Sequence, residues 1–274
     1  MRVVSKEIPI FAIIINKSLF PEPGFYMITN FIYHFGRYVM LLGQSLGGPR
    51  KLNIYFRETI RHMMDIGIGS IIIVALIAFF IGAVTAVQFS YQLGGTLIPR
   101  YYIGYIVRDM TIIELAPTIT CLVLAGKVGS NIASEIGGMR QKEHIDAMEI
   151  MGVNTASFLI LPRVIAGLTM IPLLVFMAAI ISIFGAFVAS VPIGLFSADE
   201  FIKGLGMFYD PYNVFMMFVK SVVFAFILIT IPAYQGYNVK GGSIELGNAS
   251  TAAVVFSNVF ILLSDYFIAL LLTT

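Results

Sequence analysis

The stretch IGIGSIIIVALIAFFIGAVTAVQF, residues 66 to 89, decides the fold, because it contains no charged side chain. A helix of about 20 apolar residues crosses the ~30 Å hydrocarbon layer of a bilayer, so this stretch predicts a membrane-spanning helix. Composition points the same way: of 274 residues, 58% are hydrophobic and 12% are charged, whereas about a quarter of the residues of a soluble domain are charged. A water-soluble fold is therefore not expected.

The rest of the chain divides around further apolar stretches. Four of them are long enough to cross a membrane, at residues 105–133, 164–191, 213–234 and 251–272. Together with residues 66–89 they predict an all-α, polytopic membrane protein with five transmembrane helices, in a domain of residues 66–274. Residues 192–212 and 235–250 are expected to be loops.

The N-terminal part has a different character. Residues 25–65 mix apolar and polar side chains at helical spacing, which predicts an N-terminal interfacial amphipathic helix and an elbow leading into the first span. Residues 1–24 form an extension that we leave unassigned. Its apolar stretch, Ile8 to Ile15, is too short to span and lacks a small-residue cleavage site, so no signal peptide is predicted.

The distribution of Lys and Arg predicts the orientation in the membrane. Five spans place the two termini on opposite sides. One face would carry Arg37, Arg50, Lys51, Arg57, Arg61, Arg140, Lys142, Arg163 and Lys240, and the other Arg100, Arg108 and Lys203. Cytoplasmic segments are the ones enriched in Lys and Arg, which predicts a cytoplasmic N-terminus and an outward C-terminus.

Several classes of function lack a signal in this sequence. The formal charge of +2 and the absence of basic runs argue against a nucleic-acid partner. No P-loop, H-E-x-x-H or G-x-S-x-G motif occurs, so neither ATP binding nor hydrolytic catalysis is predicted for this chain. Its single cysteine, Cys121, and its separated histidines, His34, His62 and His144, predict no metal site and no cofactor.

Three ionisable side chains fall inside the predicted spans. By counting about 1.5 Å per residue, Glu114, Lys220 and Asp265 lie at a similar depth in the outer half of the membrane. Charged groups are costly there and usually functional. We therefore hypothesise that they face an internal cavity, where they pair with one another or meet a lipid headgroup. The alternative is that Lys220 extends to the interface and the acids lie near frayed helix ends.

The loop after the second span contains the segment EHIDAMEIMGV, residues 143 to 153. Apolar and acidic side chains recur there at helical spacing and Gly152 follows, which predicts a short amphipathic helix over residues 143–151. Such a helix can insert its apolar side chains into a groove of a soluble partner, or lie flat on the membrane. The residues that would carry the contact are Glu143, Ile145, Asp146, Met148, Glu149, Met151 and Gly152.

The end of the second predicted span carries small residues at intervals of four. Ala125, Gly129, Ala133 and Gly137 would let another helix approach closely, within the chain or from a second copy. A neighbouring stripe consists of Lys127, Asn131 and Glu135. We expect a structural role for this stripe, by pairing of Lys127 with Glu135 through Asn131, or by contact with headgroups.

Two blocks of the sequence closely resemble the MlaE-type permease family. They are ELAPTITCLVLAGKVGSNIASEIGGMRQKEHIDAMEIMGV at residues 114 to 153 and GYNVKGGSIELGNASTAAVV at residues 236 to 255. The likeness extends more loosely from about residue 52 to the end. The family often has Arg where this chain has Lys127, and Gly where it has Ala116. Lys keeps the charge but lacks the planar fork needed for bidentate contacts.

The resemblance implies a function and a set of partners. Members are membrane subunits of ABC transporters of the Mla type, which move phospholipids or other hydrophobic molecules between the inner and outer membranes of bacteria. A separate cytoplasmic ATPase would dock on residues 143–151 as the coupling helix. A homodimer with a shared lipid pocket, a periplasmic lipid-binding subunit of the MCE type and a location in the bacterial inner membrane are further expectations.

Two other readings stay open at this point. Glu114, Lys220 and Asp265 could form the relay of an ion-coupled secondary transporter, although an odd number of spans disfavours the paired repeats of that class. A membrane enzyme acting on lipids is the second, and no nucleophile and base can be paired for it. Co-purification of an ATPase separates the ABC subunit from a carrier, which should be isolated alone.

Overall fold

The computed structural model describes residues 23–45, 47, 52–93 and 99–273. Arg50, Lys51 and the first 22 residues of the N-terminal extension lie outside the described residues. Within the described residues the regular elements are all helices. Five of these helical segments are long and apolar enough to cross a membrane, which confirms the expected all-α polytopic fold. The chain divides into two units, Met1–Gln44 and Ser45–Thr274, and the spans belong to the second.

Two spans are built from consecutive helical pieces. The first candidate span, Asn53–Leu93, consists of α3 (Leu52–Met63), η1 (Met64–Ile68) and α4 (Gly69–Leu93). The second, Tyr101–Gln141, consists of α5 (Tyr101–Met110), η2 (Thr111–Ile119), α6 (Thr120–Leu124), η3 (Ala125–Gly129) and α7 (Ser130–Gln141). The η elements are π-helical turns, which are rare and frequently mark functional sites.

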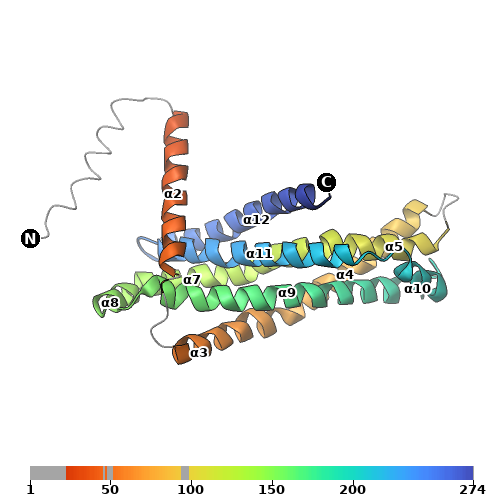
Figure 1. Ribbon diagram of the computed structural model, residues 1–274, viewed down its shortest axis with the longest axis horizontal. Coiled ribbons are helices and arrows are strands. Elements are labelled where there is room, and N and C mark those ends of the chain that lie inside the picture. Colours follow the sequence, from red (N-terminus) through yellow and green to blue (C-terminus); the bar gives the residue numbers. More distant parts are fainter. Residues whose placement is uncertain (1–22, 46, 48–51, 94–98, 274) are drawn as a thin grey trace, which may run out of the picture. The chain divides into compact units, whose positions relative to one another are not determined.

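The other three spans are single helices, and two shorter helices lie between them. The spans are α9 (Thr155–Ser190), α11 (Pro211–Tyr237) and α12 (Ser243–Thr273), and the short helices are α8 (His144–Ile150) and α10 (Ala198–Gly206). Figure 1 shows the long helices running side by side, with α3 and α8 at one end of this bundle and α10 at the other. We refer to these as the α8 end and the α10 end.

Glycines allow α4 and α9 to pack with their backbones in contact. A Cβ added at Gly82 would lie 1.7 Å from the carbonyl oxygen of Ser182, and one added at Gly185 would lie 2.3 Å from that of Phe79. No side chain fits at such distances, so these two glycines fix where the helices cross. Small residues at interfaces are the usual means of close helix packing in membranes.

The observed helices differ from the expected ranges in four places. Residues 52–65 continue into the first span through η1 rather than forming a separate piece. The expected loop at residues 192–212 contains α10, and the expected loop at residues 235–250 is shorter, because α11 ends at Tyr237 and α12 begins at Ser243. The third long helix begins at Thr155, where Asn154 accepts a hydrogen bond from the Ser157 amide, well before residue 164.

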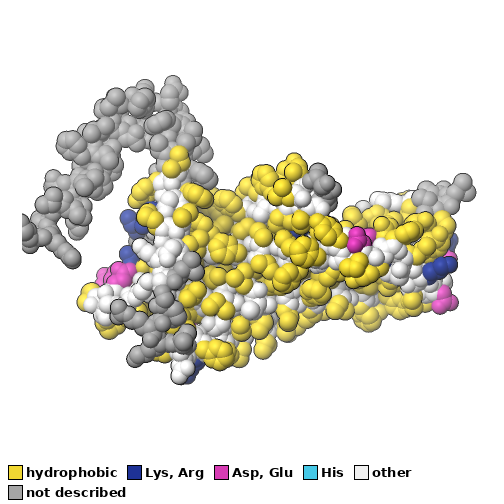
Figure 2. All heavy atoms as spheres, in the orientation of Figure 1, with side chains coloured by type: hydrophobic (Ala, Val, Ile, Leu, Met, Phe, Trp, Pro, Cys, Tyr) yellow, Lys and Arg dark blue, Asp and Glu magenta, His cyan; other side chains and the backbone are white. Residues whose placement is uncertain are grey.

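The first unit contributes one described helix, α2 (Pro23–Ser45). Ile32, Phe35, Val39 and Met40 are each at least half exposed on it, and its position in the interface stays a prediction. In the second unit, hydrophobic side chains cover most of the face seen in Figure 2, and charged side chains gather near α8 and near α5 and α10. A lipid-facing surface between two polar ends is the pattern of a membrane-spanning bundle.

Candidate functional site

Glu114, Lys220 and Asp265 come from three different helices and meet inside the bundle. The ammonium of Lys220, on α11, lies 2.6 Å from a carboxylate oxygen of Glu114 on η2 and 2.6 Å from one of Asp265 on α12. Thr118 donates a hydrogen bond of 3.0 Å to the other oxygen of Asp265. The structure therefore joins the three residues into one charged cluster, and Lys220 does not extend to the interface.

The π-helical segment η2 positions Glu114 of this charged cluster and Thr118, which donates to Asp265. It contains Glu114, Pro117 and Thr118. Proline has no backbone N–H and cannot continue the regular hydrogen-bond ladder of an α-helix, and the wider π turns accommodate this break. Sequence reasoning found the ionisable residues, and Pro117 was the visible sign that the helix departs from regular geometry beside them.

The charged cluster is unevenly exposed. The side chain of Lys220 is 0% exposed and that of Asp265 is 9% exposed, whereas that of Glu114 is 44% exposed. One ammonium can neutralise only one of the two carboxyl groups. Hydrocarbon solvates neither a carboxylate nor a carboxylic acid well, so the open side of Glu114 requires water, a polar ligand or another protein surface.

The acidic side chains of α8 hold this short helix to the bundle. Glu149 accepts hydrogen bonds from the hydroxyl groups of Thr155, at 3.1 Å, and Tyr237, at 2.9 Å. Asp146 forms an ion pair of 2.7 Å with Arg140. These contacts connect α8 to the end of α7, the start of α9 and the end of α11, so a displacement of α8 acts on all three helices.

The apolar residues of α8 divide between the bundle and the outside. Ile145 is fully buried, so it anchors the helix and is not available to a partner. Ile150 is 87% exposed and Met151 is 72% exposed. Gly152, at φ +76°, ends the helix, with hydrogen bonds from Gly152 to Glu149 and from Val153 to Met148, in the arrangement of a Schellman motif. Glu143, with φ +59°, makes the turn before α8, and Met148 is partly buried.

The stripe of small residues packs within the chain. A Cβ at Gly129 would lie 3.2 Å from Pro232, and one at Gly137 would lie 2.5 Å from Leu246. Ala125 and Ala133 are fully buried. Of the two possibilities that the sequence left open, the structure shows the intramolecular one, with α11 and α12 as neighbours.

The neighbouring stripe of Lys127, Asn131 and Glu135 does not pair internally. Lys127 donates a hydrogen bond to the carbonyl oxygen of Gly69 on the first span. Glu135 forms an ion pair of 2.9 Å with Arg163 on α9. Each charged member of the stripe thus contacts a different helix, an arrangement that the sequence analysis did not predict.

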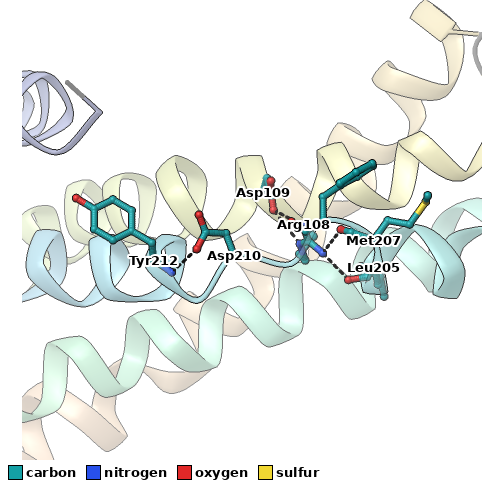
Figure 3. Close-up of polar contacts among 7 residues, drawn as sticks. Arg108, Asp109, Leu205, Met207, Asp210 and Tyr212 are labelled. Carbon is teal, nitrogen blue, oxygen red and sulfur yellow. Dashed lines mark hydrogen bonds and ion pairs between the residues drawn. The ribbon is translucent and has the colours of Figure 1, made fainter.

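A second buried cation, Arg108, was not singled out from the sequence. It is 4% exposed and donates hydrogen bonds to the carbonyl oxygens of Leu205 (2.6 Å), Met207 (2.8 Å) and Phe208 (3.2 Å), and it pairs with Asp109 at 2.7 Å. Figure 3 shows its guanidinium reaching the end of α10. Arg108 satisfies carbonyl groups that a helix end leaves unpaired, and thereby ties α10 to the second span.

The start of α10 is closed by a capping box. The hydroxyl of Ser197 accepts from the Glu200 amide (3.2 Å), and the Glu200 carboxylate accepts from the Ser197 amide (2.8 Å). The hydrogen bond from the Ser197 amide lowers the pKa of Glu200 below its ordinary value. Ser197 and Glu200 stand three residues apart, which is the sequence signature of this motif, so α10 could have been expected.

Among the described residues no group of three His, Cys, Asp or Glu side chains could hold a metal ion.

Comparison with known proteins assigns the chain to a family. The family profile "Permease MlaE" matches residues 59–271, which is most of the chain and covers all or nearly all of each candidate span. This chain belongs to the Permease MlaE family. The family resemblance given by residues 114–153 and 236–255 is thereby confirmed.

Individual relatives cover nearly the same length. A probable ABC transporter permease protein of Rickettsia felis is 35% identical over 253 residues, which cover 88% of this chain and 97% of the relative. The intermembrane phospholipid transport system permease protein MlaE of Haemophilus influenzae is 28% identical over 253 residues, covering 88% and 96%. The chloroplastic protein TRIGALACTOSYLDIACYLGLYCEROL 1 of Arabidopsis thaliana is 28% identical over 227 residues, covering 83% and 65%.

Proposed function

We propose that this multi-pass membrane protein is the permease subunit of an ABC transporter that moves phospholipids or related hydrophobic molecules between the inner and outer membranes. Hydrolysis of ATP takes place on a separate chain. Family membership, and relatives that are named as ABC transporter permeases and as a phospholipid transport permease, support this function. The observation that carries the proposal is α8, because it is attached to three helices and still exposes an apolar tip.

The tip of α8, which we define as Ile150 and Met151, is the docking point for the ATPase. Both side chains are largely exposed, and apolar side chains on a short helix fit a groove of a soluble partner. Glu149 transmits movement of the tip to Thr155 and Tyr237, with which it is hydrogen-bonded. Nucleotide-driven movement of the partner therefore reaches α9 and α11 directly, and α11 carries Lys220.

The charged cluster of Glu114, Lys220 and Asp265 lines the lipid cavity. Its open side, at Glu114, faces the cavity that two copies of the chain form together. The exposed carboxyl group of Glu114 offers a polar partner to a lipid headgroup. Lys220 lies nine residues after Pro211, which corresponds to a depth of about 14 Å along the helix.

Orientation and further partners complete the proposal. Most of the Lys and Arg residues in the loops and at the ends of the spans lie at the α8 end, which is therefore cytoplasmic by the positive-inside rule. The α10 end and the C-terminus are then periplasmic. The protein is placed in the bacterial inner membrane as a homodimer. A periplasmic lipid-binding subunit of the MCE type receives or delivers the lipid at the α10 end.

Two variants of the α8 tip test the coupling. Ile150→Ser combined with Met151→Ser removes the exposed apolar surface and should release the ATPase during purification. Ile244→Ser is the matched control, because Ile244 is 77% exposed in the first turn of α12 at the same end, and it should retain the partner. Retention of the ATPase by the tip variant would overturn the docking proposal.

Lipid transfer in reconstituted vesicles tests the cavity and the class of transporter. Glu114→Gln keeps the shape of the side chain and removes its charge, and it should reduce ATP-dependent transfer of phospholipid while the ATPase stays bound. Unchanged transfer would remove Glu114 from the mechanism. If the chain alone moved ions or lipid without ATP, in dependence on the same three residues, an ion-coupled carrier would replace the proposed ABC subunit.

A further inference from the structure

A second polar site lies toward the α8 end, separate from the charged cluster around Lys220. It is a pocket of about 490 Å³ between the first, second and third spans, within the usual size range of small-molecule sites. Its lining includes His62, Asp65, Lys127, Asn131, Glu135 and Arg163. Polar and ionisable side chains from three spans therefore converge on one pocket.

The side chains that line this pocket differ in exposure between its floor and its mouth. Arg163 is 2% exposed and His62 is 9% exposed, so both form the floor. Asp65, Lys127 and Glu135 are exposed at the mouth. Arg163 uses one terminal nitrogen on Glu135 and the other on the Leu159 carbonyl, while its Nε has no hydrogen-bond partner. A buried guanidinium donor without a partner is unfavourable, and it adds positive charge beneath the pocket.

The depth of the pocket matches the headgroup region of a bilayer. The helix α9 has 36 residues, or about 54 Å, and a hydrocarbon core of about 30 Å centred on it leaves about 12 Å at each end. Arg163 lies eight residues after Thr155, which is also about 12 Å. The floor of the pocket is therefore level with the phosphates of the leaflet on the α8 side.

The charges of the pocket indicate the kind of headgroup. Lys127 and Arg163 are balanced by Asp65 and Glu135, so the site holds both signs and little net charge. A ligand that also carries both signs fits this balance better than a purely anionic one. Two π-helical turns, η1 with Asp65 and η3 with Lys127, border the pocket, and such turns are common at functional sites.

We propose that this pocket binds the zwitterionic, phosphate- and amine-bearing headgroup of a phospholipid in the leaflet at the α8 end. Lys127 at the mouth holds the phosphate, the charge of the buried Arg163 guanidinium lies beneath it, and Asp65 holds the ammonium. The inference rests on the proposed transport of phospholipid and adds to it a lipid site outside the cavity around Lys220. Both sites belong to the same chain and can be altered separately.

Calorimetric titration of the purified complex, without ATP, tests this site. The probe is dihexanoylphosphatidylethanolamine, and Lys127→Gln should weaken its binding about tenfold, or about 1.4 kcal/mol. Arg163→Gln combined with Glu135→Gln, which removes both charges of the pair together, should weaken it similarly. Asp65→Asn should weaken this probe but not dihexanoylphosphatidylglycerol, which lacks the amine. Lys142→Gln, an exposed cation outside the pocket, should change nothing.

Competition separates the possible sources of the headgroup. Phosphoethanolamine alone should bind at least tenfold more weakly than the lipid, and equal affinity would show a site for a soluble ligand instead. Cysteine protection gives a second measurement if a variant is unstable: Asn131→Cys at the pocket mouth should be shielded from a water-soluble maleimide by the lipid probe, since Cys121 is buried. Equal binding by all pocket variants, with no shielding, would overturn the inference.

ATP-dependent lipid transfer by the wild-type complex is measured in parallel. Transfer without headgroup binding at this pocket would reject the inference and leave the proposed function standing. An absence of transfer by the wild-type complex would reject the proposed function itself.

Discussion

Arg108 and Lys220 are both buried cations in membrane-spanning helices, and they are satisfied in different ways. Arg108 contacts three backbone carbonyls at the end of α10 and the adjacent Asp109. Lys220 contacts two carboxylates, from η2 and α12. The partners of Arg108 are mostly backbone carbonyls, and its one carboxylate partner, Asp109, is 17% exposed, whereas one carboxylate partner of Lys220, Glu114, is 44% exposed.

The comparison shows that a charge within a membrane helix does not by itself indicate transport. Arg108 ties α10 to the second span, and we call α10 with this attachment the cap. Every donor nitrogen of the Arg108 guanidinium is directed at a protein acceptor. The charged cluster around Lys220 connects three spans and leaves a carboxylate open. We therefore expect substitution of Arg108 to affect stability alone, and substitution of Lys220 to affect both stability and transport.

Lys220→Ala should give the largest effect and would test this distinction most directly. Removing one partner of a buried ion pair costs about 3–5 kcal/mol, because Glu114 and Asp265 would be left together without a cation. The triple variant Lys220→Met, Glu114→Gln, Asp265→Asn removes all the charges and should recover most of the stability. Thermal unfolding of the purified protein measures the first effect, and lipid transfer in vesicles should be lost in both variants. Transfer by the triple variant at the wild-type rate would show that the charged cluster is only structural.

Arg108→Ala should destabilise the protein by about 3 kcal/mol, since it leaves several carbonyls without a charged donor. Arg108→Lys should recover part of this loss, because Lys keeps the positive charge. The recovery should be incomplete, because a single ammonium group cannot donate to all of these separated carbonyls as a guanidinium does. Lipid transfer per folded molecule should stay at the wild-type level in both variants. A loss of transfer in a well-folded Arg108→Lys protein would mean that the cap takes part in transport.

Gly204→Ala addresses the same cap by steric means. A Cβ at Gly204 would lie 2.0 Å from the Tyr101 carbonyl oxygen, whereas one at Gly206, also in α10, would meet nothing within 4 Å. Forcing α10 away from α5 should cost about 2 kcal/mol, the usual scale of overpacking. Gly206→Ala is the control and should be neutral or slightly stabilising. Equal unfolding temperatures for the two variants would contradict the close contact between α5 and α10.

Sequence reasoning found the spans because hydropathy over about 20 residues is a strong signal. Depth counting also placed Glu114, Lys220 and Asp265 at one level, where the structure shows them in contact. Pairings such as Glu135 with Arg163 were missed, since they depend on the rotation of each helix about its axis, which periodicity fixes poorly in segments that are apolar all round.

The two short helices, α8 and α10, were the hardest elements to predict from the sequence. The helix α10 is nine residues long and lies in a stretch that was assigned as a loop, although the spacing of Ser197 and Glu200 gave a local signal. For α8 the helix was predicted correctly, but Ile145 was grouped with the exposed apolar residues, and it is buried. In a helix of seven residues, spacing alone does not separate the apolar residues that face the bundle from those that are exposed.

Substitutions in the capping box of α10 should give the smallest effect on stability. This effect should also depend on pH. Because the Ser197 amide lowers the pKa of Glu200, ionised Glu200 stabilises α10 above the ordinary pKa of 4.5, and this stabilisation is lost as the pH falls through the lowered value. Hydrogen exchange of the α10 amides, corrected for intrinsic rates, should show this loss in the wild type. Glu200→Gln should abolish the pH dependence, and Ser197→Ala should cost about 1 kcal/mol at neutral pH. Because the cap is closed within the chain, neither variant should alter lipid transfer at neutral pH, and a change there would connect α10 to the transport site after all.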